Sequence, residues 1–158
     1  MLSLIIPCFN EEKNLEKLFK NIKISLKDFS SIKLEILIVD NGSTDSSNKH
    51  IKNSDLYLEK KIKLIEIKNN IGYGNGILEG IKACSGDYVA WCHADLQTEP
   101  LDVLKVFIKS KQKLSSEICV IKGKRTNRNL VDYFFTLGMT IITFCLFRVR
   151  LNDINAQP

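Results

Sequence analysis

The chain has 158 residues, of which 44% are hydrophobic and 26% are charged, proportions typical of a soluble globular domain. It is long enough to bury a core, which excludes a disordered chain, a collagen-like repeat and a disulfide-stapled miniprotein. The net charge is +5, and residues 119–158 contribute six Lys or Arg, including all four arginines, against two Asp. This asymmetry favours an anionic partner for the C-terminal part, such as phosphate, nucleic acid or a membrane surface, over a merely solvated basic face.

The cysteines and the N-terminus indicate a cytoplasmic protein. The five cysteines are odd in number, have no C-x-x-C spacing and lie within apolar runs, which is typical of reduced core residues. The N-terminus has no basic segment and only a short apolar run before Pro7. We therefore do not expect a signal peptide.

Short apolar runs alternate along the chain with amphipathic segments of helical length. In chain order the predicted elements are a strand at 2–7, a helix at 11–29, a strand at 34–39, a short helix near 46–53, a strand at 62–67, a glycine-rich stretch at 69–76 that leads into a helix through 84, a strand at 88–92, a helix from Pro100 and a fifth strand at 117–121. This alternation predicts an α/β fold with a mostly parallel central sheet that helices cover on both faces.

Residues 133–147 are apolar apart from three threonines and a glycine. Fifteen helical residues span about 22 Å, which is less than the ~30 Å hydrocarbon core of a bilayer, so this segment is not expected to cross a membrane. Two interpretations stay open. The segment is either a buried helix or an interfacial helix flanked by Arg125, Arg128, Arg148 and Arg150.

Polar side chains follow four of the predicted strands, at the edge where parallel sheets bind ligands. They comprise Asn10, Glu11 and Glu12 after the first strand, Asp40, Ser43 and Asp45 after the second, His93, Asp95 and Gln97 after the fourth, and Lys122, Lys124, Arg125 and Arg128 after the fifth. Carboxylate and amide oxygens beside cations suit a divalent metal ion and a diphosphate bound together. Each group alone also has a structural explanation, namely a helix dipole, a helix cap or an Asx turn.

Two other motifs are weak. Cys92 and His93 suggest zinc, but His50 is the only other histidine and no second Cys/His pair exists. The glycine run at 72–76 does not complete G-x-G-x-x-G, because position 77 is Ile, and the chain has no P-loop motif. We expect these glycines to let the loop turn tightly or pass close to a ligand.

Four segments together resemble family 2 glycosyltransferases of the GT-A fold, and most closely the polyprenol-phosphate branch, which is similar to dolichol-phosphate mannosyltransferases. They are SLIIPCFNEE at 3–12, IVDNGSTD at 38–45, NIGYG at 70–74 and GDYVAWCHADLQ at 86–97. The resemblance implies a three-layer GT-A fold in a single domain over 1–158. Within it, 1–125 would bind the nucleotide sugar, and 126–158 would form an incomplete acceptor-side or membrane-side helix.

The resemblance also implies a function, the inverting transfer of a sugar from a nucleoside-diphosphate donor to a polyprenol phosphate or saccharide. Pro7, Glu11 and Asp40 would line the nucleoside pocket, with Asp40 contacting the base. Arg125 would bind phosphate oxygens. Asp153 would correspond to a late acidic motif near the acceptor, although an ionised lipid phosphate needs no general base. No nucleic-acid partner is implied.

The metal ligands implied by the resemblance are Asp95 and Gln97, which with His93 would hold Mg²⁺ or Mn²⁺ against the diphosphate. The family usually has Asp where this chain has His93, so one negative charge is lost. We expect the segment after the fourth strand to be extended, so that His93, Asp95 and Gln97 alternate along it and face the same side. The alternative is that Asp95 only caps the turn that leads to Pro100.

The chain ends soon after the late motif, whereas family members continue, so we expect the donor-binding part of a larger enzyme, placed in the cytoplasm or at the cytoplasmic face of a membrane. Three alternatives are kept. A non-catalytic nucleotide-sugar-binding remnant is the first. A nucleotidyltransferase would need a basic glycine-rich loop after the first strand, and a signalling receiver domain would need an Asp after the third; the sequence has neither.

Overall fold

The computed structural model describes residues 1–116, 118–123 and 130–148. The chain divides into two compact units, Met1–Glu117 and Ile118–Pro158, which are described one at a time.

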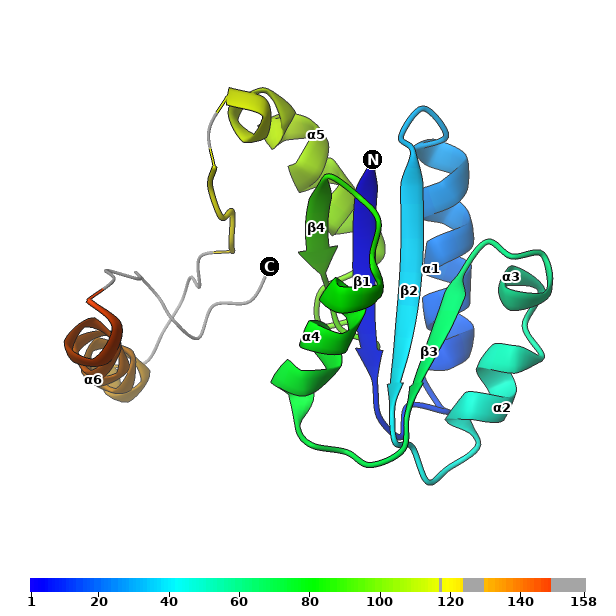
Figure 1. Ribbon diagram of the computed structural model, residues 1–158, viewed down its shortest axis with the longest axis horizontal. Coiled ribbons are helices and arrows are strands. Elements are labelled where there is room, and N and C mark those ends of the chain that lie inside the picture. The colour runs from blue at the N-terminus through cyan, green and yellow to red at the C-terminus, as the bar shows by residue number, and fades with distance from the viewer. Residues whose placement is uncertain (117, 124–129, 149–158) are drawn as a thin grey trace. The chain divides into compact units, whose positions relative to one another are not determined.

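The first unit is built on a parallel sheet of four strands (Figure 1). The strands are β1 (Leu2–Cys8), β2 (Leu34–Asn41), β3 (Lys63–Ile67) and β4 (Tyr88–Trp91), in the order β3-β2-β1-β4. In the central pair, Ile6 lies opposite Ile38 and Cys8 opposite Asp40. All seven residues of β1 are buried, which explains why this strand is almost continuously apolar.

Helices cover both faces of this sheet. The helices of the unit are α1 (Leu15–Asp28), α2 (Ser47–Lys52), α3 (Asp55–Leu58), α4 (Tyr73–Ala83) and α5 (Pro100–Ser116). Because successive strand residues point to opposite faces, Ile6 and Ile38 pack in one core with Leu18 of α1, whereas Ile5 packs against Gly80 of α4. The predicted α/β class with a parallel sheet and two covering layers is therefore confirmed.

The largest differences from the predicted elements before residue 60 concern α1 and α3. The helix predicted at 11–29 begins only at Leu15, because residues 12–14 form a turn in which the Asn14 N–H donates to the Glu11 carbonyl at 2.8 Å. The one-turn helix α3 was not predicted, and the Ser54 side chain caps it by accepting a hydrogen bond from the Tyr57 N–H at 3.3 Å.

The fifth strand predicted at 117–121 is wrong for the residues that the structure describes there. Residues 118–123 form no strand, and the Ile118 and Val120 side chains are 108% and 82% exposed. A β-favouring sequence becomes a strand only when it finds a neighbouring strand and a surface to pack on. This segment has neither within the described residues.

The second unit contains α6 (Leu130–Phe147), which includes the predicted helix at 133–147. Two threonine hydroxyls of α6 donate back to its own backbone, Thr140 to the Thr136 carbonyl at 2.9 Å and Thr143 to the Met139 carbonyl at 2.8 Å. Most of its large apolar side chains are exposed: Val131, Phe134, Phe135, Leu137, Met139, Ile141, Ile142, Phe144, Leu146 and Phe147. Among the described helices, none is long and apolar enough to span a bilayer.

Candidate functional site

Two loops interlock at the carboxyl edge of the sheet, where β1 and β2 end. The Asn10 side-chain oxygen accepts hydrogen bonds from the Thr44 N–H at 2.8 Å and the Asp45 N–H at 3.3 Å. The Glu12 N–H donates to Asp45 at 3.2 Å, and Glu12 in turn accepts from the Ser46 N–H at 2.9 Å. Asn10 has a positive φ of 56°, which Asn tolerates better than most residues. The acidic side chains after β1 and β2 therefore hold the two loops together.

Pro7 and Glu11 are predicted to line a nucleoside pocket. In the structure Pro7 packs near α4, and Glu11 forms hydrogen bonds with Ser47 and Asn14. Pro7 is buried within β1, and a Cβ built on Gly76 of α4 would lie 3.4 Å from the Pro7 Cβ. The Glu11 N–H donates to the Ser47 hydroxyl at 2.9 Å, and the Glu11 carboxylate accepts from the Asn14 amide at 2.6 Å. Glu11 thus braces the start of α1.

Asp40 occupies the end of β2 and is only 5% exposed. One carboxylate oxygen accepts from the Ser43 N–H at 3.0 Å, and the other accepts from the Asn48 amide of α2 at 2.7 Å. A carboxylate has about four lone-pair positions, so these two bonds leave capacity for a ligand donor. Burial and then the charge of Asp40 raise the pKa of the neighbouring Cys8 thiol to about 12, so Cys8 is a neutral core residue.

The glycine-rich loop after β3 is fastened to the end of β2 by Asn41. The Asn41 amide donates to the Asn70 side-chain oxygen at 3.1 Å and to the Gly72 carbonyl at 3.0 Å. Gly42, with φ of 76°, allows the close approach, because a Cβ there would lie 2.8 Å from the Asn70 nitrogen. The buried side-chain oxygen of Asn41 accepts no hydrogen bond within the described part of the chain.

At the end of β4, His93 stacks on Tyr73, the first residue of α4. The two rings are nearly parallel, with centroids 5.0 Å apart and an interplanar angle of 6°. The Tyr73 hydroxyl and the His93 Nε2 are hydrogen-bonded at 3.2 Å. Partial burial, followed by the nearby Cys92 and Asp95, raises the pKa of the Tyr73 phenol to about 12, so it stays protonated.

The segment after β4 is not extended, and the expectation that His93, Asp95 and Gln97 alternate on one side is wrong. The chain turns at Asp95, and Leu96 has a positive φ of 63°. The Gln97 N–H donates to the Asp95 carboxylate at 3.0 Å, which closes an Asx-type turn. Asp95 is half-buried and Gln97 is exposed. Asp95 thus has the turn-forming role that the sequence left open as an alternative.

The donor groups near β4 fit a cation that a bound phosphate also helps to hold. Within residues 1–116, 118–123 and 130–148, no three or more His, Cys, Asp or Glu side chains form a cluster that could hold a metal ion. Mg²⁺ commonly takes only one or two protein carboxylates, with water and substrate phosphates as further ligands. Asp95 can supply one such carboxylate. Arg125 and Asp153, predicted to bind phosphate and to lie near the acceptor, fall outside the described residues.

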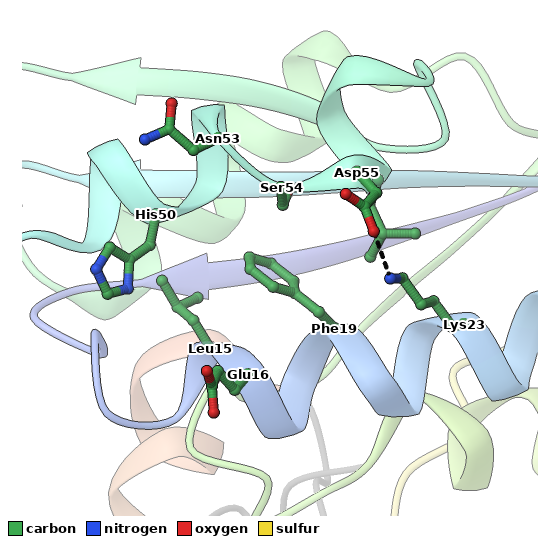
Figure 2. Close-up of a pocket in the computed structure, with 9 residues that line it drawn as sticks. Leu15, Glu16, Phe19, Lys23, His50, Asn53, Ser54 and Asp55 are labelled. Atoms are coloured by element: carbon green, nitrogen blue, oxygen red, sulfur yellow. Dashed lines mark hydrogen bonds and ion pairs between the residues drawn. The ribbon is translucent and has the colours of Figure 1, made fainter.

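A pocket of about 280 Å³ lies between α1 and the α2–α3 segment (Figure 2). Phe19 and the Lys23–Asp55 ion pair, with 2.9 Å between nitrogen and oxygen, form part of its wall. None of the predicted site residues lines it. Sequence analysis also did not single out Tyr73, Asn41 or Asn48 as partners of site residues, although Tyr73 lies inside the 70–74 motif.

The four parallel strands, the interlocked acidic loops and the anchored glycine loop define an α/β protein with its candidate site at the carboxyl edge of the sheet. The chain belongs to glycosyl transferase family 2, whose sequence pattern matches residues 3–153. This result agrees with the resemblance found in the sequence. It favours a glycosyltransferase over the nucleotidyltransferase and receiver-domain alternatives.

Two curated relatives are identical to this chain at about a quarter of the aligned positions. An undecaprenyl-phosphate 4-deoxy-4-formamido-L-arabinose transferase from Pseudomonas fluorescens is 26% identical over 132 residues, which is 84% of this chain and 38% of the relative. A dodecaprenyl-phosphate galacturonate synthase from Rhizobium johnstonii is 27% identical over 130 residues, 80% of this chain and 36% of the relative. The chain therefore spans a little over a third of the length of these relatives.

Solved structures confirm the GT-A fold. TarS 1–349 from S. aureus in complex with UDP-GlcNAc has a TM-score of 0.61 at 23% identity, over 82% of this chain and 36% of that one. The mannosyltransferase PcManGT from Pyrobaculum calidifontis in complex with GDP-Man and Mn²⁺ has a TM-score of 0.57 at 24% identity, over 68% of this chain and 31% of that one. At these identities the likeness concerns the fold alone.

Proposed function

We propose that this chain is the donor-binding part of a glycosyltransferase that moves a sugar from a nucleoside diphosphate to a lipid phosphate of the polyprenol type. The family match over residues 3–153 carries the proposal. The two curated relatives described above support the acceptor class, since their names specify undecaprenyl phosphate and dodecaprenyl phosphate.

The donor would bind at the carboxyl edge of the sheet. Asp40, held by Ser43 and Asn48, would accept a hydrogen bond from a base N–H, with Pro7 and Glu11 supporting the loop around it. Asp95 would be the carboxylate ligand of Mg²⁺ or Mn²⁺, assisted by Gln97 or His93. When bound, such a cation stabilises negative charge on a departing diphosphate.

The chemistry would be an in-line attack of the acceptor oxygen on the anomeric carbon, with inversion. A lipid phosphate is already ionised at neutral pH, so no residue has to remove a proton from it. Asp153 would then orient the acceptor rather than act as a general base. Arg125 would stabilise the phosphate oxygens of the leaving nucleoside diphosphate through charge-assisted hydrogen bonds.

The acceptor class further suggests that the protein works at the cytoplasmic face of a membrane. A polyprenol phosphate resides in a bilayer, and the exposed apolar side chains of α6 would contact that bilayer beside Arg148. The segment would lie on the membrane and not cross it.

A non-catalytic nucleotide-sugar-binding protein is the second candidate. One observation favours it: His93 stands where the family usually has a carboxylate. It would share the donor site and lack turnover.

The test is a thermal-shift panel of nucleoside diphosphates and their sugars with Mn²⁺ and Mg²⁺, followed by an assay of nucleoside diphosphate release with a short-chain polyprenyl phosphate. We expect one base to raise the melting temperature, more so with metal, and release to require the acceptor. Asp40→Ala is the matched control and should lose the thermal shift. No shift with any nucleotide contradicts the proposal, and binding without release supports the second candidate.

A further inference from the structure

We infer that Tyr73 is a positioning residue of the donor site, which holds the ring of His93 in one orientation. Because the Tyr73 hydroxyl is hydrogen-bonded to Nε2 of His93, only Nδ1 of that ring is available to bind a metal ion or a phosphate. The inference rests on the proposed function. It concerns Tyr73 and His93, of which His93 stands where the family usually has a carboxylate. It starts from the stacked and hydrogen-bonded rings of Tyr73 and His93.

The hydrogen bond occupies Nε2 in either tautomer of His93. If the Tyr73 hydroxyl donates, the Nε2 lone pair accepts; if Nε2 carries the proton, it donates to the hydroxyl and has no lone pair to offer a metal. In both cases Nε2 is unavailable as a ligand. A partner on one ring nitrogen is also the usual way in which proteins set the orientation of an imidazole that uses its other nitrogen.

The stacking fixes the orientation of the imidazole ring, which a carboxylate at this position would not require. A flat ring at the end of a strand is free to rotate unless another surface holds it, and the Tyr73 ring lies against it at an angle of 6°. Tyr73 is itself fixed, because it is the first residue of α4 and directly follows Gly72, the residue whose carbonyl accepts from Asn41. Asn41 belongs to β2, so the orientation of His93 depends on the strand that also carries Asp40.

The first test needs no ligand. The protein, labelled with ¹⁵N in its two histidines, is studied by NMR at about pH 8. His50→Gln assigns the signals. We expect the His93 ring nitrogens to show one dominant tautomer, and Tyr73→Phe, which keeps the stacking and removes the hydroxyl, to shift them. Unchanged His93 signals in Tyr73→Phe overturn the inference.

The second test measures the affinity for nucleoside diphosphate with Mn²⁺ by calorimetry. Loss of one hydrogen bond in Tyr73→Phe should weaken binding about two- to tenfold. The same substitution in a His93→Phe background should have no further effect, because Tyr73 acts through His93. Tyr88→Phe is the matched control, since it removes a phenol hydrogen bond of 3.1 Å to Ser115. It should leave binding unchanged.

The outcomes separate this inference from the proposed function. An equal loss from Tyr73→Phe with and without His93 overturns the inference, since Tyr73 would then act directly on the ligand. If no nucleoside diphosphate binds to the wild type, the proposed function fails, and the NMR comparison alone decides whether Tyr73 orients His93. Circular dichroism of each variant establishes that it is folded.

Discussion

Asp40 and Asp95 each combine a local structural task with a candidate role in binding. Asp40 accepts hydrogen bonds from Ser43 and Asn48, and Asp95 accepts one from the Gln97 backbone. Such bonds hold a carboxylate in one orientation before a ligand arrives, which reduces the entropy lost on binding. Substitutions therefore have to separate the two tasks.

For Asp40, removal of the side chain should weaken nucleoside diphosphate binding. A hydrogen bond to a charged group contributes about 1.5–3 kcal/mol, so Asp40→Ala should reduce affinity by roughly 10- to 150-fold in a calorimetric titration. Because Asp40 also holds Ser43 and Asn48, the melting temperature of the variant should fall as well. Unchanged affinity in a folded variant would remove Asp40 from the site.

For Asp95, the turn geometry allows a substitution that removes the charge and keeps the turn. Asn at this position keeps an oxygen that accepts from the Gln97 N–H, so Asp95→Asn should preserve the turn and the melting temperature. It loses the negative charge, so the enhancement of nucleotide affinity by Mn²⁺ should disappear. His93→Asp should keep or strengthen that enhancement by adding a carboxylate. A metal effect that persists in Asp95→Asn, measured by calorimetry with and without Mn²⁺, would show that Asp95 only forms the turn.

At the scale of elements, Glu35 connects strands at the edge of the sheet opposite to the candidate site. Its carboxylate, 8% exposed, accepts hydrogen bonds from the Ser3 hydroxyl at 2.5 Å, the Ser85 N–H at 2.8 Å and Lys63 at 2.5 Å. Burial alone would raise the pKa of Glu35, but the bonds from Lys63, Ser3 and Ser85 outweigh it and lower the pKa from 4.5 to about 2. The ionised form is therefore the one that stabilises the fold.

This lowered pKa predicts an acid dependence of stability. The contribution of Glu35 should be complete above about pH 4.5, the unfolded-state value, and should be lost as the pH falls towards 2. Glu35→Gln should reduce the free energy of unfolding by about 1.5–3 kcal/mol at pH 7, and its difference from wild type should shrink in acid. Urea denaturation at pH 7 and pH 3.5 measures this. Glu79→Gln, at an exposed pair with Lys82, is the control; an equal effect of both variants would contradict the prediction.

The packing of α4 on β1 depends on a glycine. A Cβ on Gly80 would lie 2.4 Å from the Ile5 Cγ2, whereas a Cβ on Gly74 in the same helix would meet nothing within 4 Å. Gly80→Ala should therefore destabilise the protein by about 1–3 kcal/mol through overpacking. Gly74→Ala should be neutral or stabilising by up to about 1 kcal/mol, because Ala favours helix. Urea denaturation compares the two, and equal effects would mean that α4 does not pack on Ile5 as described.

For the molecule as a whole, the two units differ in character. The first, Met1–Glu117, buries a core of apolar residues around the sheet, whereas α6 of the second exposes most of its large apolar side chains. The net positive charge is concentrated in 119–158, which has six Lys or Arg against two Asp. Exposed apolar side chains together with positive charge are the combination that binds anionic membranes.

Vesicle co-sedimentation should therefore increase with the fraction of anionic lipid and decrease with salt, because salt screens the arginines. Phe135→Ser and Phe147→Ser, at positions 71% and 69% exposed, should reduce sedimentation. A substitution at exposed Leu58, outside α6, serves as the control. Absence of sedimentation at any lipid composition would contradict membrane contact.

Sequence alone was sufficient to predict the order of the elements up to residue 116 apart from α3, the parallel α/β class and the family. These features depend on short-range patterns, that is, the periodicity of apolar residues and the turn-forming residues around 40–47 and 69–76, which are local in the chain. Asp40 could likewise be placed at the end of β2, because a carboxylate that follows an apolar strand lies at the edge of the sheet.

Only the tertiary structure decided which side chains meet. The stacking of Tyr73 on His93 joins residues 20 apart, and the bond from Asn41 to Gly72 joins residues 31 apart. Pairings across such separations leave no periodic trace in one sequence. The same reason explains the errors: of the strand expected at 117–121, the described residues 118–121 form none, and a turn at Leu96 replaced the alternation of His93, Asp95 and Gln97. Strand formation and side-chain orientation depend on what packs alongside, and the fold alone supplies that.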